Sequence, residues 1–457
     1  MPALFDPNDS RPLHFLGIGG AGMSALALVA RRRGVPVTGD DLDPAAFADL
    51  EAAGATVWLG ADPVRVVGAR AVVVTAAAPP THPEIVAAHA GGIPVIYRKQ
   101  ALAELVNGTT LAAIAGTHGK TTTTVMTTLA LAGAGWHPSA LAGGRVAAWH
   151  GNALLDSDEL FVVEADEYDQ AFLTLQPTVA VINNVEADHL ECYGSVDAME
   201  AAFVEFGSRA TRVLIGTADT GSDRVAARLG AKAWRFGIDR GDLAIHIRTL
   251  GAEGSVADIV LPDGQAARLR LQVPGVHNLR NATAALGIVF ALGAPIEPAV
   301  NALHAFTGVG RRFERLGEVH GITLIDDYAH HPTELVATLA ATRQAFPGRR
   351  IVAVFQPHLY SRTREHAVAM GEALAAADIA VVADVYGARE APIAGVTGQW
   401  VVDAALAAGG TVVYEPVRSA LAARATDVLR DGDVLLTMGA GDVTQVGREV
   451  RALLEHT

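Results

Sequence analysis

Short apolar runs alternate along the chain with longer, alanine-rich segments of mixed polarity. Valine and isoleucine dominate the short runs, as is typical of strands buried on both faces of a parallel sheet, and the segments between them have the length of covering helices. The alternation predicts an α/β fold of doubly wound sheets. At 457 residues the chain is too long for a single core, so we expect about three domains.

Residues 1–107 predict a Rossmann-like N-terminal domain. An apolar strand and a glycine-rich turn occupy 14–22, and an alanine-rich helix follows. Further strands are expected at 35–41, 71–75 and 93–96.

Residues 108–308 predict a central α/β domain of the phosphate-loop ATPase type. Its strands are expected at 160–163, 179–182 and 212–215. From 234 to 273 the pattern changes to short alternating strands, which predict a small added antiparallel sheet.

Residues 309–457 predict a C-terminal Rossmann-like domain after a glycine-flanked boundary at Gly308 to Gly310. The predicted strands of this domain, each followed by a helical pattern, end at Asp326, Gln356, Ala383 and Met438.

Composition narrows the class of protein. The net charge is −14 without a long basic cluster, which argues against nucleic-acid binding, and the one basic triplet, Arg31 to Arg33, is expected to be a solvated helix end. No apolar run reaches the roughly 18 residues that span a bilayer, and the N-terminus does not have the pattern of a secretory signal. Cys192 is the single cysteine, which excludes an internal disulfide. A cytoplasmic enzyme is expected.

The most informative stretch is LAAIAGTHGKTTTT, residues 111–124. It predicts a strand, a phosphate loop and a helix, in which backbone N–H groups and the helix N-terminus bind phosphate. Lys120 can reach the outer phosphates and the Thr121 hydroxyl can ligate Mg²⁺. The usual first glycine is replaced by Ile114, so the loop is a shortened form; a plain turn before a helix is the other interpretation. The predicted nucleotide ligands are Gly116, Thr117, His118, Gly119, Lys120, Thr121 and Thr122.

An earlier glycine motif allows several interpretations. Gly17, Gly19 and Gly22 have dinucleotide-fold spacing, and Asp40 or Asp41 about twenty residues later invites an NAD-binding interpretation. The same spacing suits any diphosphate ligand, or a purely structural turn. A second phosphate loop on another domain favours an enzyme that joins two phosphorylated ligands over one that transfers hydride.

Carboxylates follow the next two predicted strands. The segment EADEYD, residues 164–169, places four carboxylates within six residues, which predicts a nearby cation. Glu164 leaves its strand first and is the predicted Mg²⁺ ligand; an acidic solvated loop is the alternative. His189, beyond the following strand, can hold a divalent metal or orient a substrate.

Several later residues are candidates of lower specificity. Asn278 and Asn281 share a helix face on which amides can read an adenine edge, although helix capping explains them equally well. Arg311 lies at the predicted hinge, where it can swing onto a transferring phosphoryl group or simply face solvent. Arg362 and Arg364 offer two-pronged recognition of a carboxylate.

An ordered set of motifs resembles the Mur ligases of peptidoglycan synthesis: GIGGAGMSALA, AGTHGKTTTT, EADEYD, NNVEADH, GVHNLRNATAA, GVGRRFE, DDYAHHPTE, FQPHLYSRTR and MGAGD. The resemblance covers nearly the whole chain in collinear order. It implies a first domain that binds the UDP part of UDP-N-acetylmuramate, a central domain that binds ATP and Mg²⁺, and a third that binds the amino acid. A monomer or homodimer is expected.

The resemblance also implies roles for single residues. The implied catalytic residues are Lys120, His189, Arg311 and His330. Thr121, Glu164 and His189 match metal positions, and the further ATP positions are His277, Asn281, Arg311 and Asp326. The implied ligands of the UDP substrate are Gly17, Gly19, Gly20, Gly22, Met23, Asp41, Thr75 and Ala76, and those of the amino acid are His330, Arg362 and Arg364.

The match is nearest to the branch that adds L-alanine. Several sister ligases carry a carbamylated lysine after the equivalent of His189, whereas no lysine occurs here between Lys120 and Lys232. The third-domain motifs favour this branch over the one that attaches recycled tripeptide. The implied reaction activates the lactyl carboxylate as an acyl phosphate, which the amine of L-alanine attacks, releasing ADP and phosphate. An NAD-dependent oxidoreductase and a non-catalytic nucleotide switch are the competing interpretations, and both leave the paired arginines and the third domain without a purpose.

Overall fold

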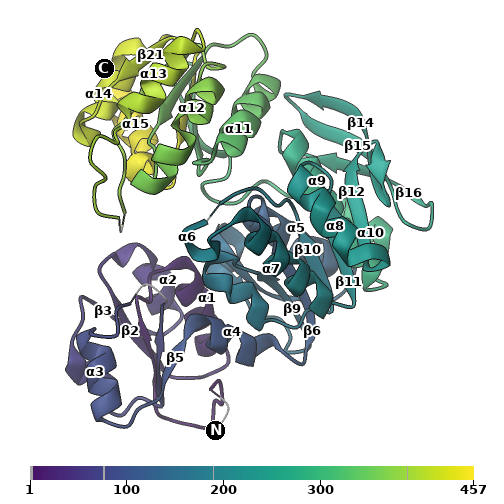
Figure 1. Cartoon of the computed structure of the whole chain (residues 1–457), viewed down its shortest axis with the longest axis vertical. Helices are drawn as coiled ribbons and strands as arrows, with labels where there is room; N and C mark the ends of the chain where they lie inside the picture. Colours follow the sequence, from purple (N-terminus) through teal and green to yellow (C-terminus); the bar gives the residue numbers. More distant parts are fainter. Residues whose placement is uncertain (1–3, 76–77, 189, 389, 457) are drawn as a thin grey trace. The chain divides into compact units, whose positions relative to one another are not determined.

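The computed structural model describes residues 4–75, 78–188, 190–388 and 390–456, with the backbone alone at Leu190 and Glu191. It is an α/β protein with three sheets (Figure 1), as the sequence predicts. The chain divides into two compact units. The first unit comprises Met1–Ile247, Ala257–Arg270 and Arg280–Phe306, and the second comprises Arg248–Val256, Leu271–Leu279 and Thr307–Thr457.

The first sheet is parallel, with strand order β3-β2-β1-β4-β5. Its strands are β1 (Leu13–Leu16), β2 (Val37–Asp41), β3 (Thr56–Leu59), β4 (Ala71–Val74) and β5 (Val95–Tyr97). Its helices are α1 (Ala21–Arg32), α2 (Phe47–Ala52), α3 (Pro83–Ala90) and α4 (Arg98–Val106). Strand β3 is not among the predicted strands, because this edge strand is partly exposed along its whole length and lacks a buried apolar run.

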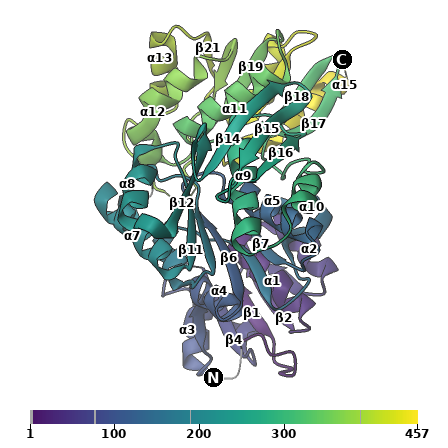
Figure 2. The same cartoon turned by 90° about the vertical axis from the view of Figure 1, so that its right-hand side faces the viewer.

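The central sheet has eleven strands in the order β16-β15-β14-β12-β11-β10-β6-β9-β7-β8, with β13 paired to β12. Its strands are β6 (Thr110–Ala115), β7 (Ser139–Val146), β8 (Gly151–Leu154), β9 (Leu160–Glu164), β10 (Val179–Ile182), β11 (Arg212–Gly216), β12 (Ala233–Ile238), β13 (Arg240–Gly241), β14 (Leu243–Gly251), β15 (Gly254–Val260) and β16 (Ala266–Leu271). The helices between them and after them are α5 (Lys120–Gly133), α6 (Leu190–Tyr193), α7 (Val196–Arg209), α8 (Thr220–Leu229), α9 (Val276–Ala291) and α10 (Ile296–Leu303). The short strands expected after residue 234 are present and extend this sheet at one edge (Figure 2).

Helix α1 joins the first sheet to the central one. Buried residues of both sheets form one continuous hydrophobic cluster, to which α1 contributes residues from Met23 to Ala30. The close approach leaves no room for a side chain at Gly151 of β8, where a Cβ would lie 2.6 Å from Leu28 Cδ1.

The basic triplet lies at the end of α1, as expected, and Arg32 is exposed there. The expectation was incomplete, because Arg32 also donates to the carbonyls of Trp149 and Ala153, and Arg33 pairs with Asp158. These two guanidinium groups connect α1 of the first sheet to the central sheet.

The third sheet has the order β17-β18-β22-β19-β20-β21, in which only the β17–β18 pair is antiparallel. Its strands are β17 (Glu314–Val319), β18 (Ile322–Asp327), β19 (Ile351–Phe355), β20 (Ile379–Val382), β21 (Val412–Tyr414) and β22 (Val434–Met438). The helices are α11 (Pro332–Ala345), α12 (Tyr360–Leu374), α13 (Gln399–Ala407), α14 (Leu421–Val428) and α15 (Val446–Glu455). The predicted strand ends at Asp326, Gln356, Ala383 and Met438 are correct to within one residue.

Alternate residues of these strands face opposite helix layers. On β19, Ile351, Ala353 and Phe355 pack with α11, α12 and α13, whereas Val352 and Val354 pack with α14 and α15. This is the double winding that the buried strands predict. Among the described residues, no helix has both the length and the apolar character needed to cross a bilayer.

Candidate active site

The phosphate loop follows the central strand β6 and opens helix α5. Gly116 has φ +127° and Gly119 has φ +80°, a region that favours glycine. A Cβ on Gly116 would lie 2.8 Å from the backbone nitrogen of Asn183, so this position also has no space for a side chain. The loop therefore needs both of its glycines for shape.

Two asparagines from the neighbouring strand end hold the loop from outside. Asn183 and Asn184 follow β10, which is paired to β6. The Asn184 side-chain oxygen accepts the His118 N–H at 2.7 Å, and the Asn183 amide donates to the His118 carbonyl at 3.2 Å. Asn183 and Asn184 are not among the predicted site residues, although two amides directly after a buried strand were a usable signal.

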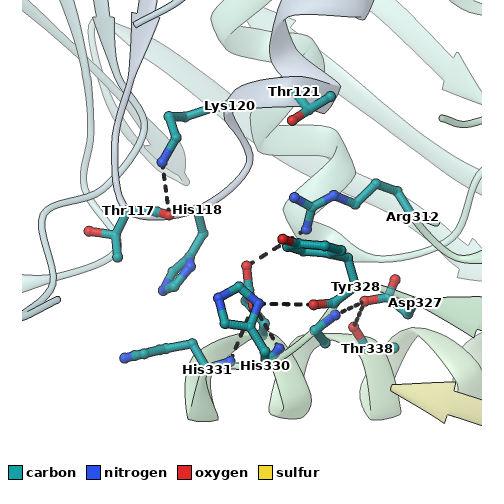
Figure 3. Close-up of polar contacts among 12 residues, drawn as sticks. Thr117, His118, Lys120, Thr121, Arg312, Asp327, Tyr328, His330, His331 and Thr338 are labelled. Atoms are coloured by element: carbon teal, nitrogen blue, oxygen red, sulfur yellow. Dashed lines mark hydrogen bonds and ion pairs between the residues drawn. The ribbon is translucent and has the colours of Figure 1, made fainter. Parts of the chain in front are cut away.

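The Lys120 ammonium contacts both the loop and the EADEYD segment. It donates to the Thr117 carbonyl at 3.3 Å (Figure 3). It also donates to the Gly116 carbonyl at 2.7 Å and pairs with Glu167 Oε1 at 2.8 Å. Burial alone would lower the pKa of Lys120, but the carboxylates of Glu167 and Glu164 outweigh it and raise that pKa. The lysine is therefore a fixed positive charge in the loop.

Two of the three predicted Mg²⁺ ligands, Thr121 and Glu164, lie within the described residues and contact each other. The Thr121 hydroxyl donates to Glu164 Oε2 at 2.9 Å, and the backbone N–H of Gly143 donates to the same oxygen at 2.6 Å. Glu164 ends β9, and Thr121 opens α5 on the adjacent strand β6. The third predicted metal ligand, His189, lies outside the described residues.

The other carboxylates of the EADEYD segment face cations of the chain. Asp166 pairs with Arg98 at 2.8 Å, Glu167 with Lys120, and Asp169 with Lys99 at 2.9 Å. Glu164 instead accepts from neutral donors. This difference makes Glu164 the carboxylate of the segment best suited to an added cation.

Asn281 of α9 packs against the loop. A Cβ on Gly119 would lie 2.6 Å from Asn281 Oδ1, so the amide is next to the turn that precedes Lys120. His118 lies within 3.7 Å of Glu186 in the same region. Thr122 is buried in the first turn of α5.

The first glycine loop is shaped by the end of β2. The backbone N–H groups of Gly17 and Ile18 both donate to the Asp40 carbonyl at 2.9 Å, and that of Gly19 donates to Asp41 Oδ2 at 2.8 Å. The Asp41 carboxylate thus contacts the loop itself. A Cβ on Gly17 would lie 3.5 Å from Thr75 Cγ2, which puts Thr75 beside the loop.

The remaining predicted substrate ligands near this loop differ in placement. Gly20 precedes α1, and Gly22 lies in its first turn, where a Cβ would be 2.7 Å from the Arg98 guanidinium. The Met23 side chain is buried in the hydrophobic core, so only its backbone lies at the loop. Ala76 lies outside the described residues.

In the second unit, Arg311 is held at the start of the third sheet. Its guanidinium donates to the Gly439 carbonyl at 2.8 Å and lies 4.8 Å from the Tyr328 ring centre. Arg311 Nε is 3.7 Å from Asp326 Oδ2, so these two predicted residues are neighbours. Burial raises the pKa of Asp326, although hydroxyls of Thr437 and Thr444 donate to it.

His330 follows β18 and is fixed before α11 (Figure 3). Its Nδ1 lies 2.9 Å from the Tyr328 carbonyl and 3.2 Å from Glu334 Oε2. Burial lowers the pKa of His330 to about 3, outweighing Glu334. The imidazole is therefore neutral near pH 7, with its proton on Nδ1 toward the carbonyl and Nε2 as an acceptor.

The adjacent Asp327 has a structural task. Its carboxylate accepts the N–H groups of Phe313 and Ala329 and the Thr338 hydroxyl, at 2.7, 2.8 and 3.2 Å. Burial raises its pKa to about 6, against the opposing charge of Arg312.

The two candidate arginines of α12, Arg362 and Arg364, differ in burial. Arg362 is buried, its Nη1 lies 3.4 Å from His358 Nδ1, and the His358 ring is 5.9 Å from that of His330. Arg364 is exposed, since residues two apart on a helix do not share a face. The structure therefore does not bring the two together as a two-pronged pair.

His277 belongs to the second unit and Asn281 to the first. His277 packs beside Gly275, where a Cβ would lie 2.5 Å from its Cε1. The Asn278 side-chain amide donates to the Pro274 carbonyl at 2.7 Å, just before the start of α9.

Three family models match successive parts of this chain. Residues 12–110 match the family model "Mur ligase family, catalytic domain", residues 114–289 "Mur ligase middle domain", and residues 311–441 "Mur ligase, glutamate ligase domain". The chain is 43% identical over 460 residues to UDP-N-acetylmuramate–L-alanine ligase of Cutibacterium acnes, covering 99% of this chain and 98% of the relative.

Solved structures give the same result. UDP-N-acetylmuramate-alanine ligase of Thermotoga maritima matches with a TM-score of 0.84 at 28% identity, over 98% of this chain and 99% of that one. A murein peptide ligase of Psychrobacter arcticus matches with a TM-score of 0.72 at 26% identity, over 98% and 99%. From its glycine loops to its third sheet, this chain belongs to the Mur ligase family.

Proposed function

We propose that this protein is an ATP-dependent ligase that joins L-alanine to the lactyl carboxylate of UDP-N-acetylmuramate in peptidoglycan precursor synthesis. Full-length relatives at 43–45% identity carry the name of that activity. These relatives favour single-alanine addition over attachment of a recycled tripeptide. They also leave no support for an NAD-dependent oxidoreductase or a non-catalytic switch.

The observation that carries the proposal is the contact between Thr121 and Glu164 beside Lys120. A hydroxyl and a carboxylate at 2.9 Å form a donor set of hard oxygens, which fits Mg²⁺ completed by phosphate oxygens and water. When bound there, Mg²⁺ would neutralise charge on the outer phosphates of ATP. His189 is the proposed further metal ligand.

The ATP-binding residues are proposed on both units. Gly116, Thr117, His118, Gly119 and Thr122 would hold the phosphates through the loop and the start of α5. Asn281 and His277 are the proposed adenine contacts. Arg311 and Asp326 of the second unit are the further proposed ATP contacts.

The first glycine loop is the proposed site of the UDP diphosphate. Gly17, Gly19, Gly20 and Gly22 permit close approach of the backbone. Thr75, Ala76, Asp41 and the backbone at Met23 would line the same ligand. We accordingly assign residues 1–107 to the UDP substrate, 108–308 to ATP and Mg²⁺, and 309–457 to the amino acid.

The proposed reaction needs two steps because a carboxylate is a poor electrophile. The γ-phosphoryl group of ATP is first transferred to the lactyl carboxylate, giving an acyl phosphate and ADP. The free amine of L-alanine then attacks the carbonyl carbon, and phosphate leaves. Lys120 and Arg311 would stabilise the charge that moves during phosphoryl transfer.

The amino acid would be positioned by His330 and Arg362. A neutral His330 offers Nε2 as an acceptor for the amine, and a buried guanidinium is suited to the carboxylate. With a pKa near 3, His330 orients the amine and is a poor proton acceptor at neutral pH.

A coupled assay of ADP release tests the proposal. UDP-N-acetylmuramate and ATP are supplied with L-alanine, glycine, L-serine or the recycled tripeptide. We expect ADP release to depend on both UDP-N-acetylmuramate and the amino acid, and L-alanine to give the highest kcat/KM. Faster release with the tripeptide, or release independent of any acceptor, would contradict the proposal.

A further inference from the structure

A buried group of ionisable side chains lies within the first sheet, beside the glycine loop. His14 of β1 is 0% exposed, Asp40 of β2 is 4% and Glu84 of α3 is 0%. His14 Nε2 lies 3.3 Å from Asp40 Oδ2 and 3.4 Å from Glu84 Oε2, and its Nδ1 lies 2.9 Å from the Thr38 hydroxyl. We call His14, Asp40 and Glu84 the buried triad.

The buried triad occupies a position where the fold expects apolar side chains. Strands of a parallel sheet are buried on both faces, and ionisable groups are costly there unless they are paired. Burial would lower the pKa of His14, but Asp40 and Glu84 outweigh it and raise that pKa. Both ring nitrogens of His14 have partners: Nε2 faces the two carboxylates and Nδ1 faces the Thr38 hydroxyl.

The pKa values of the two carboxyl groups are shifted in opposite directions. Burial, reinforced by Glu84, raises the pKa of Asp40, whereas burial of Glu84 is outweighed by its hydrogen bonds with His14 and Asp40, which lower the pKa of Glu84. The three ionisable groups are therefore paired with one another inside the sheet.

Two members of the buried triad, Asp40 and Glu84, also hold backbone groups at the carboxyl edge of the sheet. The carbonyl of Asp40 accepts the N–H groups of Gly17 and Ile18. Glu84 Oε1 accepts the N–H of Asp62 at 2.9 Å, in the segment after β3. His14 lies on β1, three residues before Gly17, and joins these two strand ends.

Asp41 extends the same arrangement to the loop surface. Its carboxylate holds the Gly19 N–H, and its own carbonyl accepts the N–H of Gly60 at 2.9 Å. Asp40 and Asp41 therefore accept the N–H groups of three successive residues of the glycine loop. The Asp40 side chain is in turn held by His14, within the buried triad. Ligands of such sheets bind at this edge.

We propose that the buried triad is a positioning device for the diphosphate of the UDP-linked substrate: it holds the end of β2 so that the glycine loop keeps its binding shape. This inference rests on the proposed function of the loop. None of the three side chains touches the substrate; they act through the backbone of Asp40 and the side chain of Asp41.

The test uses His14→Gln and Glu84→Gln in the full-length enzyme. The KM values for UDP-N-acetylmuramate, ATP and L-alanine are measured separately from kcat, together with the melting temperature. We expect KM for UDP-N-acetylmuramate to rise roughly tenfold, the loss of about one charged hydrogen bond. KM for ATP and kcat at saturation should stay within about twofold of wild type.

Val72→Ala is the matched control. Val72 lies on β4, is 0% exposed and faces His14 in the strand register, yet it carries no polar group. The substitution removes buried apolar contacts beside His14 and leaves the ionisable groups of the buried triad in place. We expect it to lower the melting temperature and to leave all three KM values unchanged.

Three results would overturn the proposal. The first is an unchanged KM for UDP-N-acetylmuramate in both triad variants, and the second is an equal rise in Val72→Ala. The third is a stoichiometric metal ion in the purified protein that is lost in His14→Gln, since the three ligand atoms lie close enough to hold one.

Two further measurements keep the test decisive. If a glutamine variant fails to fold, Thr38→Val removes only the hydroxyl partner of His14 and should give a smaller rise in the same KM; no rise would count against the proposal. If the wild-type enzyme shows no ligase turnover, the proposed function is refuted. If the wild-type enzyme is active and the variants have the same KM for UDP-N-acetylmuramate as wild type, only the positioning role is refuted.

Discussion

At the scale of single residues, Arg362 and Arg364 show how helix geometry separates two candidates of equal chemistry. Arg362 is buried beside His358, and Arg364 is exposed on the same helix. We expect Arg362→Ala to raise KM for L-alanine on the order of 100-fold, as for loss of a buried charge partner. Arg364→Ala, the matched control, should change it less than about twofold. Steady-state kinetics with varied L-alanine gives both values, and equal effects of the two substitutions would refute the assignment.

The lowered pKa of His330 predicts how the free energy of unfolding depends on pH. Its pKa is lowered from 6.5 to about 3 by burial, so the unfolded chain takes up a proton as pH falls through 6.5, while the folded chain does not until about pH 3. The stability linked to His330 is therefore present above pH 6.5 and is lost progressively as pH falls toward 3. At pH 4 this loss amounts to up to about 3 kcal/mol.

Urea unfolding at pH 7 and pH 4 measures this linkage. His330→Gln cannot titrate, so it should lose less stability than wild type over that interval. Parallel losses in the two proteins would show that burial does not hold the imidazole neutral.

The residues that could be predicted from sequence are those whose chemistry is tied to a local motif. Lys120, Thr121 and Glu164 follow strands and carry groups that suit phosphate or Mg²⁺, and the structure brings these side chains together. The buried triad was not predictable in this way, because His14 and Glu84 are 70 positions apart and neither belongs to a recognisable motif. Asp40 was noted only as an acid at a strand end, since a sequence does not say which of Asp40 and Asp41 turns inward.

At the scale of elements, the phosphate loop and the EADEYD segment depend on each other. Lys120 pairs with Glu167 inside this region, whereas Lys99 pairs with Asp169 of the same segment at a partly exposed position. We expect Lys120→Met to lower kcat/KM for ATP by on the order of 100-fold or more, because a charge aimed at the transferred phosphoryl group is lost. Lys99→Met should stay within about threefold, since exposed ion pairs contribute little. ADP release at varied ATP distinguishes them, and comparable losses would contradict the special role of Lys120.

Buried elements were predicted well because their signal is continuous. Strands β10, β19 and β22 are buried along their whole length and appear at the expected positions. Exposed or bent elements gave no such signal: β3 is partly exposed, and the β7–β8 hairpin contains a register shift. The role of Arg32 and Arg33 could not be read from a basic triplet, because their partners lie more than 100 residues further along the chain.

At the scale of the whole molecule, the proposed ATP ligands fall on both compact units. Lys120 and Glu164 belong to the first, and Arg311 and Asp326 to the second, beyond the Gly308 to Gly310 segment. We therefore expect the two units to close when substrates bind. Small-angle X-ray scattering should give a smaller radius of gyration with a non-hydrolysable ATP analogue, Mg²⁺ and UDP-N-acetylmuramate than without them. An unchanged radius would argue against closure.

The central claim is that cleavage of ATP is captured as an acyl phosphate on the lactyl carboxylate. It is tested most directly by supplying UDP-N-acetylmuramate labelled with ¹⁸O in that carboxylate and analysing the products of one turnover with L-alanine by mass spectrometry. The claim predicts that one labelled oxygen leaves the carboxylate and appears in inorganic phosphate. Label in AMP, or inorganic phosphate free of label after the amide has formed, would contradict it.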